Sequence, residues 1–98
     1  MSRAIVFLPA ARLEVISAYD WYERERLGLG SRFREELDFQ IDRIAANPQQ
    51  FPVRLQDVRG ARLRRFPYSL FFRVTDSEIA VIACFHASRD PMVWRGRA

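Results

Sequence analysis

Lysine is absent from this sequence, so the whole positive charge of the chain is carried by 16 arginines. No lysine can therefore serve as a nucleophile, a general base or a phosphate anchor, which removes one set of catalytic mechanisms. Balanced against 12 acidic residues, the arginines leave a net charge of +4. Such a modest excess permits binding to nucleic acid or to an acidic partner but requires neither.

Cysteine and histidine each occur once, as Cys84 and His86. One cysteine cannot form a disulfide within the chain, which fits a reducing cytoplasm. Its apolar neighbours in the sequence indicate an inert packing residue rather than a nucleophile. With a single Cys, a single His and no third ligand in view, we predict neither a metal site nor a cofactor.

Long hydrophobic runs are also missing. No segment approaches the ~18 apolar residues of a membrane span, and charges follow the first apolar residues too soon for a secretory signal. We therefore expect a cytoplasmic protein with no membrane partner. The 98 residues are 49% hydrophobic and 13% aromatic, which is enough for one small domain, residues 1–98, with a single core.

The most strand-like part of the chain lies between Arg59 and Trp94. Residues 78–86 are apolar on both faces of a strand, which predicts a central strand that is covered on both sides. Residues 70–75 would pair with it through a turn at Asp76–Ser77. The alternation predicts one face formed by Ile79, Val81, Ala83 and Phe85, and another formed by Ala80, Ile82, Cys84 and His86.

The rest of the chain predicts a strand at 4–8, a helix at about 10–27, a second helix at about 31–46, and strands at 53–56 and 62–66, with Gly60 in a turn. The first helix has apolar residues nearly all round its axis, with Arg12, Glu14 and Asp20 among them. Such a helix is expected to contact the sheet on one side and something else on another. The order predicts an α+β fold: an N-terminal strand, a helical hairpin, then a three- to four-stranded antiparallel sheet.

Several short motifs occur in a characteristic order along the whole chain. They are Ala10-Ala11-Arg12-Leu13, Trp21-Tyr22-Glu23, Leu29-Gly30 before Arg32-Phe33, Asn47-Pro48, Arg65-Phe66-Pro67-Tyr68 with Phe72, and His86-x-x-Arg89-Asp90-Pro91-x-x-Trp94. With this order and spacing, the sequence resembles the RelE/ParE superfamily of bacterial type II toxins. The last two motifs resemble the ParE side of the superfamily more closely.

The resemblance implies the fold described above and a cognate antitoxin that keeps the toxin silent. It also implies that the antitoxin tail is acidic and folds on binding, in keeping with the excess of arginine. Members of the superfamily act in two ways, as ribosome-dependent mRNA endonucleases or as inhibitors of DNA gyrase.

A nuclease site would need an acid or base and cations that hold the phosphate. His86 is the only histidine, Arg65, Arg73 and Arg89 carry suitable charges, and Tyr68 or Trp94 could stack a base. In the alternative interpretation, His86 is a hydrogen-bonded structural residue, and Arg89 pairs with Asp90 to anchor the tail. The missing lysine, and the lack of a carboxylate spaced against His86, argue against a nuclease.

A run of arginines around residue 62 is the other candidate for binding. On the predicted strand, Arg62 and Arg64 share a face that would attract an acidic partner, although a solvated edge strand explains them equally well. The surplus apolar residues of the first helix, and Phe39 on the polar side of the second, indicate a partner surface. The residues predicted to bind antitoxin or target are Tyr19, Trp21, Phe39, Arg62, Arg64, Tyr68 and Trp94.

These observations predict a toxin of a type II toxin–antitoxin system that inhibits DNA gyrase by binding. The alternative is a ribosome-dependent endonuclease of the RelE type, which would use His86, Arg89 and Arg65. A third hypothesis is a degenerate member that binds only its antitoxin.

Overall fold

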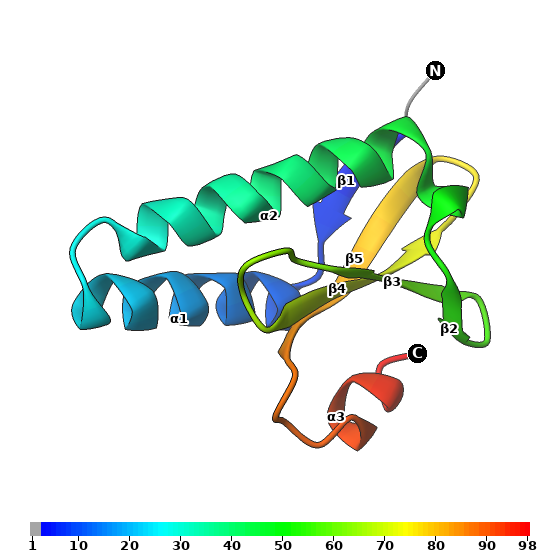
Figure 1. Cartoon of the computed structure of the whole chain (residues 1–98). Helices are drawn as coiled ribbons and strands as arrows, with labels where there is room; N and C mark the ends of the chain where they lie inside the picture. Colours follow the sequence, from blue (N-terminus) through cyan, green and yellow to red (C-terminus); the bar gives the residue numbers. More distant parts are fainter. Residues whose placement is uncertain (1–2) are drawn as a thin grey trace.

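A helical hairpin packed on one face of a curled sheet forms the frame of the protein (Figure 1). The computed structural model describes residues 3–98. Its elements are β1 (Ala4–Phe7), α1 (Pro9–Glu25), α2 (Leu29–Ala46), the short 3-10 helix η1 (Pro48–Gln50), β2 (Val53–Leu55), β3 (Val58–Arg62), β4 (Tyr68–Val74), β5 (Glu78–His86) and α3 (Met92–Arg95). The α+β class and the element order predicted from the sequence are confirmed.

The sheet has five strands in the order β1-β5-β4-β3-β2, rather than three or four. β2 to β5 form an antiparallel meander, and β1 joins it by pairing in parallel with the first half of β5. β1 therefore belongs to the same sheet, and β5 is central only as far as Val81, where β1 ends. Beyond that point β5 continues to His86, and the described part of the chain places no strand on that side.

The turn between the two helices is held by a carboxylate. Gly28 has a φ of 89°, a conformation that suits glycine, and Glu23 accepts hydrogen bonds from the backbone N–H groups of Gly28 and Gly30. A Cβ on Gly30 would lie 2.9 Å from Tyr19 O and from Glu23 Oε1. α2 consequently begins at Leu29 rather than at Ser31, and the Trp-Tyr-Glu and Leu-Gly motifs form one capping unit.

The predicted strand at 62–66 is wrong. β3 ends at Arg62, and residues 63–67 form a loop in which Leu63 and Phe66 are both buried. Two residues three positions apart cannot both point inward from one regular strand, and Pro67 has no N–H for a ladder. Gly60 lies within β3, where its missing side chain makes room for the Phe71 ring.

A bulge changes the predicted faces of β5. The register shifts at Phe71 and Phe72 of β4, so that one extra residue of β5, Ile82, lies between the partners of these two residues. After the bulge, the alternation is displaced by one. Cys84 therefore joins Ile79 and Val81 in the core under the helical hairpin, whereas Ala83 and Phe85 belong to the opposite face.

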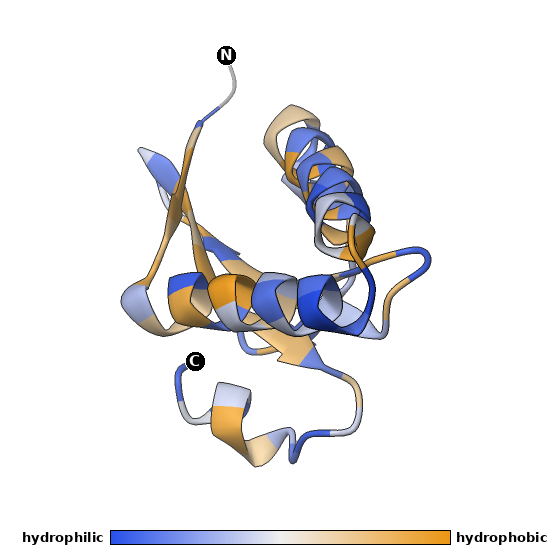
Figure 2. Ribbon diagram, turned by 90° about the vertical axis from the view of Figure 1, so that its left-hand side faces the viewer, coloured by the Kyte–Doolittle hydropathy of each residue, from blue (hydrophilic) through white to orange (hydrophobic). Residues whose placement is uncertain are grey.

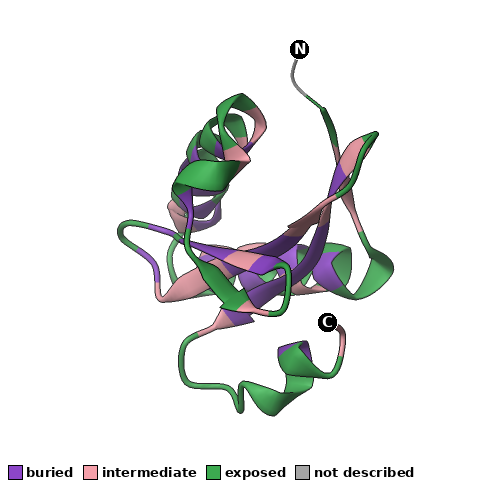
Figure 3. Ribbon diagram, turned by 90° about the vertical axis from the view of Figure 1, so that its right-hand side faces the viewer, coloured by how far each residue is buried: buried purple, intermediate pink, exposed green. Residues whose placement is uncertain are grey.

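The opposite face of the sheet is covered by the C-terminal segment. Figures 2 and 3 show α3 beneath the sheet, on the side away from the helical hairpin, and Figure 3 shows buried residues on the strands between them. Trp94 of α3 stacks on Phe71, with ring centroids 3.8 Å apart, and is only 4% exposed. Its aromatic faces are thus used for packing, which corrects the expectation that Trp94 stacks a base or meets a partner.

None of the helices in residues 3–98 combines the length and the apolarity that crossing a bilayer requires.

Candidate functional site

A groove runs between α1 and the end of β5, where no strand covers the edge of the sheet. It has a volume of about 350 Å³, and an adjoining hollow shares Trp21, Tyr68 and His86 with it. We call this the α1–β5 groove. Its lining residues are Leu13, Glu14, Ser17, Ala18, Trp21, Tyr68, Cys84, His86 and Arg89.

Glu14 lies at the centre of a dense set of hydrogen bonds in this groove. Its Oε2 accepts from Arg89 Nη1 at 2.6 Å and from Arg97 Nη2 at 3.1 Å. Its Oε1 accepts from Arg97 Nη1 at 2.9 Å and from the backbone N–H of Cys84 at 3.1 Å. The side chain is 13% exposed. Both oxygens are therefore occupied, by four donor atoms of which three belong to the guanidinium groups of Arg89 and Arg97.

The charge of Glu14 is stabilised by these contacts. Burial alone would raise the pKa of this carboxyl, but hydrogen bonds from Arg97, Arg89 and Cys84 outweigh it and hold the pKa below its ordinary value. Glu14 is thus a carboxylate at neutral pH. A carboxylate with a low pKa and four donors is a poor general base, because any proton it accepted would displace one of them.

His86 ends β5, and its ring meets the edge of Tyr68 at a centroid distance of 5.0 Å. Its Nδ1 accepts a hydrogen bond from the backbone N–H of Ser88 at 3.0 Å and lies 2.8 Å from Ser88 Oγ. A backbone donor at Nδ1 places the proton of the neutral ring on Nε2. The histidine is therefore hydrogen-bonded as a structural residue would be, with one ring nitrogen left for other contacts.

Two further titratable groups of the groove keep their protons at neutral pH. Burial, together with the Tyr22 hydroxyl, raises the pKa of Tyr68 to about 12. Burial and the nearby Glu14 carboxylate raise the pKa of the Cys84 thiol to about 12. Cys84 is accordingly an unreactive packing residue.

Arg89 does not pair with Asp90, in contrast to the expectation. It pairs with Glu14 across the groove, and its guanidinium lies 4.5 Å from the centre of the Phe85 ring. Asp90 instead accepts a hydrogen bond from the backbone N–H of Met92 at the start of α3. Arg89 is thereby fixed between α1 and β5, with 44% of its side chain exposed.

Arg65 is not brought together with His86 and Arg89. Its Nε lies 3.8 Å from Glu36 of α2, and the side chain lines a hollow on that side of the molecule. Arg73 pairs with Asp57. Of the arginines expected to hold a phosphate beside His86, only Arg89 lies in the groove.

A second charged surface forms where the loop after β3 meets α2. Arg64 lies in this loop, not on a strand, and its guanidinium is 4.1 Å from the centre of the Phe39 ring. Glu36 pairs with both Arg64 and Arg65, while the backbone oxygen of Arg62 accepts from Gln40. We call Phe39, Arg62, Arg64 and Arg65 the arginine-loop surface; Phe39 is 41% exposed there.

Tyr19 and Trp21 lie on different sides of α1, since residues two apart on a helix are turned by roughly 200°. Tyr19 packs against the main core, whereas Trp21 is 50% exposed and lines the α1–β5 groove. Only Trp21 therefore belongs to the groove with Tyr68, and the predicted partner residues fall on separate surfaces.

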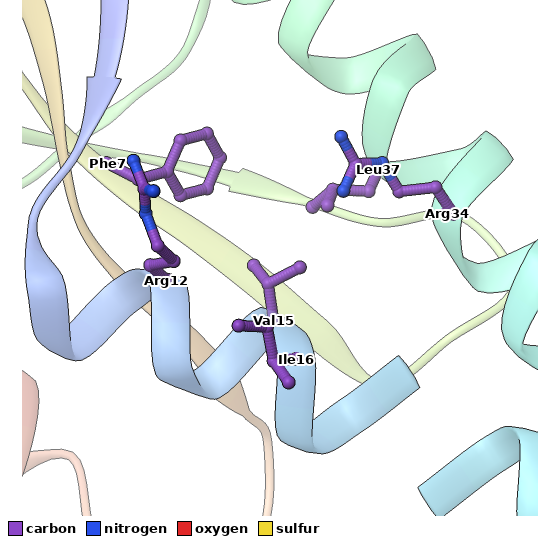
Figure 4. A pocket seen from close by; sticks show the side chains of 6 residues that line it. All are labelled: Phe7, Arg12, Val15, Ile16, Arg34 and Leu37. Carbon is purple, nitrogen blue, oxygen red and sulfur yellow. The ribbon is translucent and has the colours of Figure 1, made fainter. Parts of the chain in front are cut away.

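The space between the two helices contains a hollow that the sequence did not predict (Figure 4). Phe7, Val15 and Leu37 provide apolar walls, and the guanidinium groups of Arg12 and Arg34 lie on either side of it. An apolar floor between two positive charges suits an apolar segment that carries acidic residues.

Glu14 is the main residue of the groove that sequence reasoning missed. The one signal was its position as a charged residue within a helix that is otherwise apolar nearly all round. Its partners lie 70 to 83 positions further along the chain, so no local spacing relates them.

A family model described as "ParE toxin of type II toxin-antitoxin system, parDE" matches residues 5–91. The chain belongs to this ParE toxin family. No curated protein sequence matches the chain.

Two solved structures share the fold. A chain of the chromosomal ParDE toxin–antitoxin system from P. aeruginosa superposes with a TM-score of 0.77 at 20% identity, over 89% of this chain and 98% of that one. A mutant of the E. coli toxin RelE, in complex with a peptide of the antitoxin RelBc, gives a TM-score of 0.64 at 22% identity, over 100% and 96%. The suspected superfamily, and its ParE-like side, are confirmed.

Proposed function

We propose that this protein stops bacterial growth in the cytoplasm by binding DNA gyrase, and that a cognate antitoxin neutralises it by binding. Membership of the ParE toxin family supports a toxin. We choose gyrase over the ribosome because the α1–β5 groove offers a surface for binding but lacks a clear acid–base pair. A toxin that acts by binding needs no such pair.

The observation that carries this proposal is that both oxygens of the Glu14 carboxylate already accept hydrogen bonds from the protein itself. Glu14 is the one carboxylate among the described residues that line the groove, and four donors occupy it. Tyr68 and Cys84 are protonated at neutral pH, and burial raises the pKa of each still further from that range. Cleavage of RNA needs a group that takes the 2′-hydroxyl proton, and His86 would have to do so without a second base.

A ribosome-dependent endonuclease is the second candidate. The juxtaposition of His86, Arg89, Tyr68 and Trp21 in one groove favours it, because these groups offer an acid, a phosphate ligand and two rings for base stacking. Arg65, which was expected to complete this set, pairs with Glu36 instead. A member that binds only its antitoxin is the third hypothesis.

For the antitoxin, we propose an acidic segment that folds as it binds along the helical hairpin and the arginine-loop surface. The large apolar side chains exposed on α1 are Leu13, Ile16 and Trp21. Burying such surface contributes roughly 25 cal/mol per Å² before the cost of ordering the segment. The arginines on either side of the interhelical hollow, and those of the loop, would attract the acidic residues.

The experiment that tests this function is induction of the chain in a bacterial host without its antitoxin. We expect growth arrest with filamentation and an SOS response, because blocked gyrase leads to DNA damage rather than to loss of translation. Co-expression of the small gene beside the toxin gene should restore growth. Rapid translation arrest with cut mRNA would favour the endonuclease, and unimpaired growth at well-detected levels of folded protein would contradict a toxin.

A further inference from the structure

We infer that Glu14 is a positioning residue that holds the Arg89 guanidinium in place for contact with the target. The inference rests on the proposed function, since it takes the α1–β5 groove as the surface that meets the target. It starts from the position of Glu14, whose carboxylate joins three parts of the chain: α1, β5 and the segment after β5.

Glu14 accepts a backbone hydrogen bond at the edge of β5 that a neighbouring strand would otherwise accept. β1 pairs with β5 only as far as Val81, and none of the strands in residues 3–98 lies beside that edge of β5 beyond this residue. Side chains fill this part of the edge, because Glu14 accepts from Cys84 N–H and Arg97 donates to the backbone oxygen of Ile82. Buried backbone groups need such partners, which fixes the carboxylate relative to the sheet.

The fixed carboxylate in turn fixes Arg89. One guanidinium nitrogen lies 2.6 Å from Glu14 Oε2, and the group lies over the Phe85 ring. A short, charge-assisted hydrogen bond and an aromatic face restrict a side chain that is otherwise rich in rotamers. The Arg89 side chain is 44% exposed and lines the groove together with His86 and Trp21, so a target group that binds there would meet an arginine that is already ordered.

A structural carboxylate on the same helix provides the matched control. Glu23 also accepts two backbone hydrogen bonds, from Gly28 and Gly30 in the hairpin turn, but it does not line the groove. Glu23→Gln and Glu14→Gln both keep the size of the side chain, remove its charge and replace one of its two accepting oxygens with a donating NH2 group. A role in stability alone would give the two variants the same phenotype.

The first test measures the motion of the Arg89 side chain by ¹⁵N relaxation at its Nε. We expect a restrained signal in the wild type and in Glu23→Gln, and a mobile one in Glu14→Gln. A restrained Arg89 in Glu14→Gln would overturn the inference. The relaxation measurement does not involve gyrase, so its result is independent of the proposed function.

The second test is a double-mutant cycle on inhibition of DNA supercoiling by gyrase. Glu14→Gln should weaken inhibition by roughly tenfold, in line with the loss of one partner of a close charge pair. The same change should have no further effect in an Arg89→Met background, because Glu14 acts through Arg89. An equal loss in both backgrounds would overturn the inference. A wild type that leaves gyrase active would instead contradict the proposed function, and the relaxation measurement would still decide whether Glu14 positions Arg89.

Discussion

An Arg62→Glu, Arg64→Glu double variant is expected to associate with the acidic antitoxin roughly tenfold more slowly at low salt. Opposite charges steer two proteins together before they touch, and this contribution is lost when the charges are reversed. Both side chains belong to the arginine-loop surface, and neither is part of the main core. The measurement is the association rate at several salt concentrations, and the difference from wild type should shrink as salt rises.

The control is an Arg3→Glu, Arg95→Glu double variant, which lowers the net charge from +4 to zero in the same way. Both control residues are exposed and lie outside the arginine-loop surface. If the two double variants slow association equally, only overall charge matters, and the arginine-loop surface has no special part in recognition.

Trp21→Ala is expected to speed dissociation of the antitoxin by roughly 30-fold, corresponding to about 2 kcal/mol for a large aromatic residue at the centre of an interface. Its ring is half exposed and lines the groove, where an apolar partner would cover it. Interface changes of this kind act mainly on the dissociation rate. Circular dichroism should show an intact fold. Tyr19→Ala is a poorer test of the same surface, because Tyr19 packs against the core and its loss would lower stability as well.

Val53→Ala serves as the comparison, because Val53 is an exposed apolar residue on β2 at the far edge of the sheet. It should leave both rates unchanged. If the charge reversal and Trp21→Ala both leave association and dissociation with the antitoxin unaltered, the antitoxin binds elsewhere, and these residues form an ordinary solvent face.

The order of elements was predictable because it depends on local patterns. The 3.6-residue period of α2, the apolar run of β5 and the stop at Asn47–Pro48 each act over a few residues. Predictions failed where a residue interrupted the regular alternation of a strand. The bulge at Ile82 places Cys84 on the other face of the sheet from the one predicted. After β3 ends at Arg62, Leu63 and Phe66 are both buried, which a regular strand does not allow.

The site was harder to predict than the fold, because its contacts join distant residues. Periodicity placed His86 at a strand end and Trp21 on a helix, and the fold brought them to one groove. Nothing local indicated that Glu14 would meet Arg89 and Arg97. The burial of Trp94 could not be predicted, because no local pattern indicates that a single turn of helix, α3, covers the second face of the sheet.

We propose that the protein acts by binding gyrase and not by cutting mRNA. The most direct measurement applies the purified chain to two assays in parallel: supercoiling of relaxed plasmid by DNA gyrase, and cleavage of mRNA on ribosomes. We expect inhibition of supercoiling with intact mRNA, and Arg89→Ala should weaken the inhibition. Codon-dependent cleavage of mRNA that is lost in His86→Ala or Arg89→Ala, with gyrase unaffected, would contradict the claim.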